Sequence, residues 1–316
     1  MTAAVATAPP ARPAAPPKRS RGAFGDRRRR QSVAGLALVA PFLVSFLIFN
    51  LWPIIWSLIM AVTDMTNRDL RSPFAVEFKG LANFGQVLSD PQFGKALGVT
   101  GILVIGGIPL SLIVGMTLAV LLNTGIQRLR TFFRAAFYVP VVTSLVAIAV
   151  VWKFLFAADG LINTLLATVG VDGPTWINEP APAIAMLLLL IVWRSSGMAM
   201  ILFLAGLQAI PVELHEAAKV DGATAWRRIR SITIPLMRPT ILLVSVLMSV
   251  GLVQVFEEPF VLTRGGPLKW TTTAALHIYD LFGFGQYSLA AASSYILFLV
   301  IGAMAIIQFR MLRPKV

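Results

Sequence analysis

The 316-residue sequence contains no cysteine and only two histidines, His215 and His277, which lie far apart. The lack of cysteine excludes disulfides and thiolate chemistry, and no cluster of metal-ligating residues is recognisable. Charged residues are also scarce, at 13% compared with about a quarter in soluble domains. Hydrophobic residues reach 57% and the mean hydropathy is +0.79, so the lipid bilayer is the natural solvent for this chain.

Long apolar runs divide the sequence. About twenty apolar residues are needed to cross the roughly 30 Å hydrocarbon core of a bilayer. Six runs reach that length, and we predict one membrane span for each of them: 33–61, 96–122, 134–157, 183–208, 239–262 and 287–309. Several contain proline or glycine, which a helix bundle tolerates where neighbouring helices satisfy the freed backbone groups.

Basic residues show which side of the membrane each loop occupies. Nineteen of the 27 lysines and arginines fall in the segment before residue 33, in 127–134, in 213–239 and after residue 308. Because basic residues favour cytoplasmic loops, we expect both termini to be cytoplasmic. The same distribution explains the net charge of +13 without nucleic acid. Residues 1–32 are rich in Ala, Pro and Arg, which predicts a disordered tail before a permease domain of residues 33–316.

The cytoplasmic segment "ELHEAAKVDGATAWRRIRSITIPLMRP" (213–239) is charged and has a helical pattern. It predicts a short helix ending near Asp221 and Gly222, a tight turn, and a second helix capped by Asp221 or Thr224. We expect Pro235 to stop the second helix and Pro239 to start the next span. Trp226, Ile229 and Ile232 would form an apolar stripe. That pattern fits either an interfacial amphipathic hairpin or a docking surface for another protein.

The stretch "EAAKVDGATAWRRIRSITIP" resembles the EAA loop of ATP-binding-cassette (ABC) importer permeases. Glu216, Ala217, Ala218, Asp221, Gly222, Ala223, Ile232 and Pro235 match the motif, whereas Ile234 stands where leucine is usual. Further segments, including "GLANFGQVLSDPQFGKAL", "FFRAAFYVPVVTSLVAIAVVWKFLF" and "FVLTRGGP", resemble the maltose-type carbohydrate-uptake branch. The last of these resembles the first of the two permeases in such importers.

The resemblance implies an all-α integral membrane protein of the bacterial inner membrane, with the type I ABC importer permease fold and a coupling loop at 209–239. It also implies partners: a second permease, a pair of ATPase subunits that hold ATP and Mg, an extracytoplasmic solute-binding protein, and a sugar substrate. The residues implied to couple to the ATPase are Glu216, Ala217, Ala218, Asp221, Gly222, Ala223, Trp226 and Pro235.

No ATP chemistry is expected in this chain. A phosphate-binding loop needs Gly, four residues, then Gly-Lys and Ser or Thr. The sole Gly-Lys pair, Gly94-Lys95, is followed by Ala96, and Ser89 stands where the first glycine belongs. We therefore expect neither catalytic residues nor metal ligands here.

Arg194 lies within the fourth predicted span, where a charge is costly and calls for a partner. Glu257 and Glu258, late in the fifth predicted span, are the candidate partners. Alternatively, Arg194 extends outward and both glutamates lie at the outer water boundary. The candidates for the solute path are Arg194, Gln254, Phe256, Glu257 and Glu258. Trp152, Trp193 and Asn163 could also contact a sugar, although ordinary bundle packing or anchoring at the membrane interface explains each of them better.

The leading hypothesis is thus the permease subunit of a sugar importer. One rival is a secondary carrier driven by an ion gradient, which would show internal repeats or ion sites near the bilayer midplane. Another is an importer permease for a non-sugar solute such as a glycerol phosphodiester. A nucleic-acid binder that uses the Arg-rich tail is the third, and the shortness of the tail argues against it.

Overall fold

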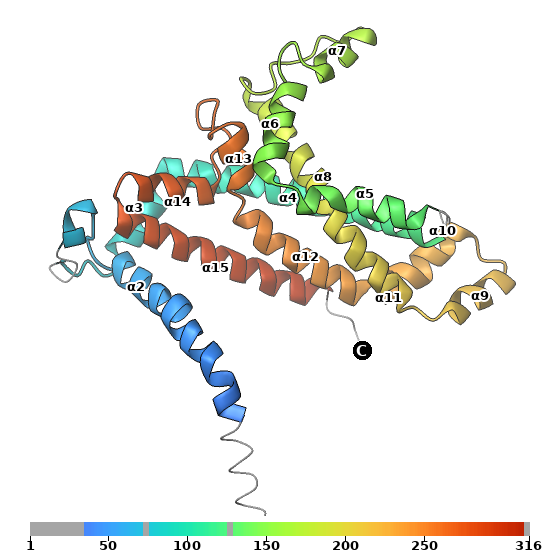
Figure 1. Ribbon diagram of the computed structural model, residues 1–316, viewed down its shortest axis with the longest axis horizontal. Coiled ribbons are helices and arrows are strands. Elements are labelled where there is room, and N and C mark those ends of the chain that lie inside the picture. The colour runs from blue at the N-terminus through green and yellow to red at the C-terminus, as the bar shows by residue number, and fades with distance from the viewer. Residues whose placement is uncertain (1–34, 72–75, 125–128, 313–316) are drawn as a thin grey trace, which may run out of the picture. The chain divides into compact units, whose positions relative to one another are not determined.

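The computed structural model describes residues 35–71, 76–124 and 129–312 (Figure 1). Within these ranges the chain is helical, and the only β-type pairing is an isolated bridge between Thr63 and Phe78. The chain divides into two compact units, residues 1–56 and 57–316. The all-α prediction is confirmed, whereas the predicted tail of residues 1–32 lies outside the described part.

Four helices are long and apolar enough to cross a membrane: Gly35–Ala61, Pro91–Asn123, Pro180–Gln208 and Tyr287–Met311. Two further pairs of shorter helices would each form one span if taken together, which gives up to six. The first, second, fourth and sixth predicted spans therefore correspond to single helices. The first contains a π-helical segment, η1 (Leu47–Leu51), followed by α2 (Trp52–Ala61).

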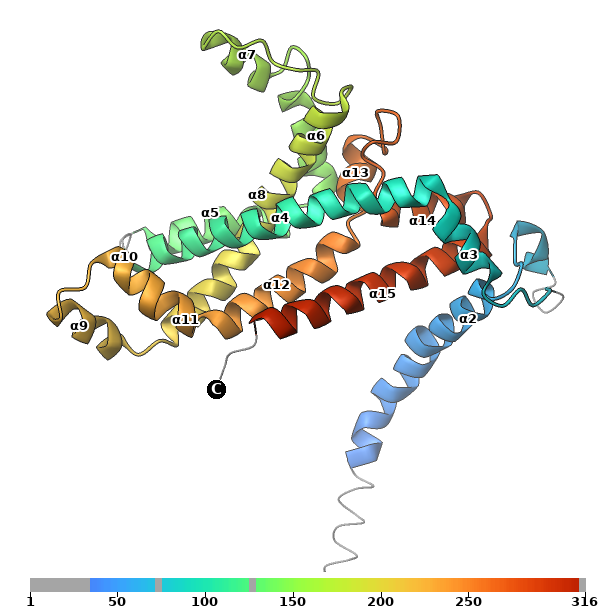
Figure 2. The same cartoon turned by 180° about the vertical axis from the view of Figure 1, so that it is seen from behind.

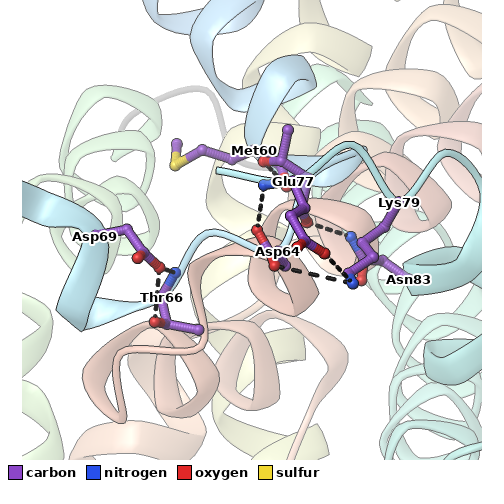
Figure 3. Close-up of polar contacts among 8 residues, drawn as sticks. Met60, Asp64, Thr66, Asp69, Glu77, Lys79 and Asn83 are labelled. Atoms are coloured by element: carbon purple, nitrogen blue, oxygen red, sulfur yellow. Dashed lines mark hydrogen bonds and ion pairs between the residues drawn. The ribbon is translucent and has the colours of Figure 1, made fainter. Parts of the chain in front are cut away.

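The segment after α2 is held by side-chain hydrogen bonds to the backbone (Figure 3). Asn83 of α3 (Ala82–Ser89) donates from Nδ2 to the carbonyl oxygens of Ala61 (2.9 Å) and Thr63 (2.7 Å). The carboxylate of Asp64 accepts a hydrogen bond from the backbone N–H of Glu77 at 2.8 Å. In the described parts of this segment, these side chains therefore give polar backbone groups of Ala61, Thr63 and Glu77 a hydrogen-bond partner.

The core of the second unit lies between α4 (Pro91–Thr124), α8 (Pro180–Gln208) and α12 (Arg238–Val253), and α15 (Tyr287–Leu312) packs on α12. The most extensive contact joins α4 and α8. A Cβ atom at Gly115 of α4 would overlap the side chain of Ala199 and approach the backbone of α8. Small residues therefore let these two backbones approach closely, as in other membrane bundles.

The third predicted span, 134–157, is wrong as a single helix. It is made of α5 (Arg130–Val142) and α6 (Leu145–Leu155), which meet at 97°. Pro140 lacks an N–H and weakens the end of α5. Thr143 then adopts an extended conformation, and its hydroxyl donates to the carbonyl of Val139 at 2.7 Å. The same carbonyl accepts the backbone N–H of Thr143 at 3.1 Å, so the end of α5 stays hydrogen-bonded up to the break.

The fifth predicted span, 239–262, is also too long. Helix α12 ends at Val253, and a separate short helix, α13 (Glu257–Leu262), follows. The carbonyl of Val255 accepts a hydrogen bond from the Thr273 hydroxyl at 2.6 Å, just before α14 (Ala274–Gly283). This carbonyl is therefore satisfied outside any helix, and the break places the two glutamates at the start of α13.

Candidate functional site

The predicted coupling loop contains a helix that stands apart from the bundle. Helix α9 (Val212–Val220) lies at the opposite end of the second unit from α3 in both views (Figures 1 and 2). It buries none of its side chains, and Val220 is 88% exposed. Glu213 lies in its first turn and Lys219 in its last, which suits the helix dipole.

The end of α9 is a Schellman turn. The N–H of Ala223 donates to the carbonyl of Ala218 at 2.8 Å, and that of Gly222 donates to Lys219 at 3.0 Å. Gly222 has φ of +74°, a left-handed conformation that suits glycine. The prediction that glycine permits the tight turn is therefore confirmed. Asp221 serves as the C-cap of α9.

The second helix of the loop has Thr224 as its N-cap, so Thr224 and not Asp221 is the cap. The Thr224 hydroxyl accepts a hydrogen bond from the N–H of Arg227 at 3.3 Å, and α10 (Ala225–Arg228) follows. The helix continues through a π-helical turn, η3 (Ile229–Thr233), into α11 (Ile234–Leu236).

The expectation that Pro235 stops this helix is wrong. Pro235 lies inside the helical run Ala225–Leu236, directly after the π-helical turn, and the helix continues past it to Leu236. The chain turns only at Met237, and the run Ala225–Leu236 meets α12 at 67°. Pro239 does lie in the first turn of α12, as expected.

Most of the predicted coupling residues are exposed. Glu216, Ala217, Asp221, Gly222 and Pro235 are exposed, whereas Ala218 and Ala223 are half-buried. Trp226 differs from the others because its ring lines an apolar groove beside α4, although 69% of the residue is exposed. The EAA residues of α9 and its turn thus present an open surface, whereas Trp226 faces the bundle.

The five solute-path candidates come together in one pocket of about 350 Å³. Arg194 of α8 forms one wall, and the chain between α12 and α13 forms the other. The residues that line the pocket and were singled out from the sequence are Arg194, Gln254, Phe256, Glu257 and Glu258. Arg194 precedes the other four by at least sixty residues in the sequence, so only the tertiary fold brings it beside them.

Arg194 pairs with Glu258. Its Nη1 atom donates to Oε1 of Glu258 at 3.1 Å, and the side chains are 31% and 11% exposed. This contact confirms the pairing hypothesis against the alternative that Arg194 extends outward. Glu257 is exposed, and it does not appear in any ion pair found among the described residues. The α13 break explains the choice, because consecutive residues at the start of a helix point in different directions.

An aromatic cluster adjoins the pocket. The ring of Phe256 stacks on Phe260 with centroids 5.1 Å apart and lies 4.9 Å from the ring of Tyr279 on α14. Tyr279 is about half exposed. The spacing of Phe256 and Phe260 was visible in the sequence as an (i, i+4) pair. Tyr279 carried no such signal, because only the fold of α14 brings it here.

The remaining sugar-contact candidates have structural partners. Trp152 is buried and stacks on Phe156 at 5.1 Å. Asn163, in α7 (Leu161–Thr168), accepts a hydrogen bond from Trp176 Nε1 at 2.7 Å and donates to the carbonyls of Ala158 and Pro174. Its amide is therefore fully used in ordering the loop. Trp193, beside Arg194, remains 44% exposed and also contacts Trp152.

The structure combines a helical bundle, which has several membrane-length helices, with a pocket that holds a partly buried ion pair and with a projecting EAA helix. These features define a membrane permease of the importer type. The chain belongs to the family described as "Binding-protein-dependent transport system inner membrane component", whose sequence model matches residues 107–316. The match covers α8 to α15 entirely, and therefore both the pocket and the EAA loop.

Named relatives extend the similarity over most of the chain. The lactose transport system permease LacF of Rhizobium radiobacter is 34% identical over 91% of this chain and 97% of its own length. The trehalose/maltose permease MalF of Thermococcus litoralis is 30% identical over 89% of this chain and 94% of its length. The arabinooligosaccharide permease AraP of Bacillus subtilis is 30% identical and covers 89% of each.

Solved structures support the same fold. A bacterial ABC transporter that imports the acidic polysaccharide alginate matches with a TM-score of 0.76 and 25% identity, over 93% of this chain and 99% of that one. The same type of transporter, in complex with an alginate pentasaccharide-bound periplasmic protein, matches with a TM-score of 0.77. The fold is therefore that of an ABC importer permease, and the recognition made from the EAA motif is confirmed.

Proposed function

We propose that this chain is the permease subunit of an ATP-driven, binding-protein-dependent sugar importer, and that it forms half of the translocation pathway. The relatives named above are permeases of lactose, trehalose/maltose and arabinooligosaccharide transport systems. A sugar is therefore favoured over a glycerol phosphodiester. Family membership likewise favours an importer over an ion-driven secondary carrier.

The proposed coupling to an ATPase rests on the exposed surface of α9. A nine-residue helix is marginal in water by itself, and most helices in proteins are stabilised by packing. Here Val212, Leu214 and Val220 remain exposed outside any membrane-length helix. We infer that a separate ATPase subunit covers this surface, and that it holds the ATP and Mg. Glu216, at the centre of the open face, would make a polar contact with it.

The mechanical link runs through the ends of the loop. Helix α9 follows α8 after three residues, and the rigid Ala225–Leu236 segment leads into α12. Movement of α9 by closing ATPases would therefore shift α8 and α12 together. These are the helices that flank the Arg194–Glu258 pocket. The proposed topology places α9 and both termini in the cytoplasm and an external binding protein on the opposite side.

The pocket suits a polyhydroxylated ligand. Arg194, Gln254 and the two glutamates offer hydrogen-bond donors and acceptors, and Phe256 offers an aromatic face. Binding sites for small polar ligands combine apolar walls with a few such groups. The proposal does not specify one sugar, and mass spectrometry of the ligand retained by the cognate binding protein would identify it.

Gly222→Ala tests the coupling role. Because φ is +74° with open space around the position, alanine adds backbone strain of about 1–2 kcal/mol and little else. We expect this strain to disturb the docking of α9 and lower solute-stimulated ATP hydrolysis on the order of tenfold. The measurement is ATPase activity of the assembled complex in nanodiscs, with and without loaded binding protein.

Gly170→Ala is the matched control. Gly170 has φ of +77° and equally open surroundings, but it lies in the loop after α7. The proposal predicts normal coupling in this variant and co-purification of the ATPase with the wild-type permease. Equal coupling in both glycine variants, or solute uptake by the purified chain without any ATPase, would contradict it.

A further inference from the structure

The solute pocket carries an excess of negative charge. Two carboxylates, Glu257 and Glu258, and one cationic side chain, Arg194, belong to its lining. The other lining residues, which include Gln254 and Ser195, are uncharged. One positive and two negative charges leave the lining with a formal charge of −1.

The cation of the pocket is already bound. Nη1 of Arg194 donates to Oε1 of Glu258 at 3.1 Å, and Nε of the same guanidinium is buried. An acidic solute would have to compete with Glu258 for this guanidinium. Success would leave a carboxylate that is only 11% exposed without its partner, which is strongly unfavourable. The lining therefore offers an acidic solute no free cation.

Glu257 supplies the excess charge. It is exposed, it lines the pocket, and it belongs to none of the ion pairs found in the described part of the chain. It is the first residue of α13, and this helix packs against α6 and α8. The packing fixes its backbone beside the wall that carries Arg194. The fold thus holds one carboxylate without a neutralising cation at the pocket.

We propose that Glu257 selects solutes by charge, so that the pocket admits neutral sugars and amino sugars and repels acidic sugars such as uronates. This inference rests on the proposed function and adds the charge class of the solute. The fold alone does not decide that class, because the matched alginate importer carries an acidic polysaccharide.

The physical basis is electrostatic. A negative group within about 5 Å of Glu257 is repelled more strongly than it would be in water, because protein walls lower the effective dielectric constant. The hydroxyl groups of a neutral sugar can instead donate hydrogen bonds to the carboxylate, and such charge-assisted bonds are stronger than those between neutral groups. An ammonium group on an amino sugar gains both the hydrogen bond and the Coulomb attraction.

Rates of thiol modification measure this selectivity without any sugar. The chain has no cysteine, so Gln254→Cys places its one thiol in the pocket lining. The assembled complex in nanodiscs is treated with a cationic or an anionic methanethiosulfonate of similar size, and mass spectrometry follows modification of the labelled peptide. Each rate is divided by the rate of the same reagent with 2-mercaptoethanol, which removes the intrinsic difference between the reagents.

We expect the cationic reagent to react faster in the Gln254→Cys complex. Adding Glu257→Gln should lower the ratio of cationic to anionic rates on the order of tenfold, because the carboxylate attracts one reagent and repels the other. Glu257→Asp keeps the charge and should preserve the ratio. Glu213→Gln removes an exposed carboxylate from α9, outside the pocket, and should leave the ratio unchanged. Size-exclusion profiles verify that each variant assembles.

Two outcomes would overturn the proposal. A ratio that stays the same in Glu257→Gln would show that this carboxylate does not set the potential of the pocket. Faster reaction of the anionic reagent would show that another subunit supplies a neutralising cation. Failure of the proposed function is seen separately, as a lack of ATP-dependent sugar uptake by the wild-type complex, because the thiol rates do not depend on transport.

Discussion

The Arg194–Glu258 pair joins α8 to α13 at the wall of the solute pocket, and its removal has a calculable effect. At 3.1 Å and an effective dielectric constant of about 20, the direct attraction is roughly 5 kcal/mol before desolvation is subtracted. Loss of one partner from a fully buried pair costs about 3–5 kcal/mol, because the other charge is left without compensation. Arg194 is 31% exposed, and water therefore screens part of this cost.

We expect Arg194→Met to destabilise the permease by about 2–3 kcal/mol, because it leaves the carboxylate of Glu258 only 11% exposed and unpaired. Glu258→Gln should cost less, about 1–2 kcal/mol, since an amide oxygen can still accept from the guanidinium. The double variant, with both Arg194→Met and Glu258→Gln, should lose less stability than the sum of the two single losses, because neither charge remains without a partner.

Glu257→Gln is the matched control, as it removes the neighbouring exposed carboxylate and should change stability by less than about 0.5 kcal/mol. Thermal unfolding in detergent, followed by tryptophan fluorescence, compares the four variants with the wild type. Solute uptake by the reconstituted complex is measured in parallel. If Arg194 lies in the solute path, Arg194→Met should lower uptake by more than its loss of stability explains. Midpoints of Arg194→Met and Glu257→Gln that coincide would refute the reasoning, and unchanged uptake would remove Arg194 from the solute path.

Two further predictions concern packing and pH. Gly197→Ala should lower the free energy of unfolding by about 1–3 kcal/mol, because its Cβ would overlap the backbone carbonyl of Phe137. The control is Gly98→Ala, which lies in open space and should be neutral or slightly stabilising. Equal unfolding midpoints of the two variants would contradict this prediction. Burial lowers the pKa of His277, and Asp90 offsets this only in part. The unfolded chain therefore binds the proton more tightly, so stability should fall as pH drops below about 6.5, and His277→Gln should flatten that slope. An identical slope in the variant would exclude His277 as the cause.

The sequence alone determined the class of the protein and the layout of its loop. Hydrophobic length is set by the thickness of the bilayer, so four of the predicted spans correspond to single helices. The Gly222 turn followed from local backbone chemistry, because few residues other than glycine tolerate its φ of +74°. The EAA motif identified the family, because all of its residues lie within one short stretch of the sequence.

Only the tertiary structure decided where helices break and which charges meet. The bend after Val142 follows Pro140, and the gap before Glu257 depends on the Thr273 hydroxyl, which replaces the helical bond that Pro259 cannot donate to the Val255 carbonyl. Composition cannot reveal such replacements, because both segments are as apolar as a straight span. The choice of Glu258 over Glu257 follows from that gap, since it fixes the direction in which each carboxylate points. Hydrophobic runs specify that a segment enters the membrane, whereas long-range hydrogen bonds specify its path there.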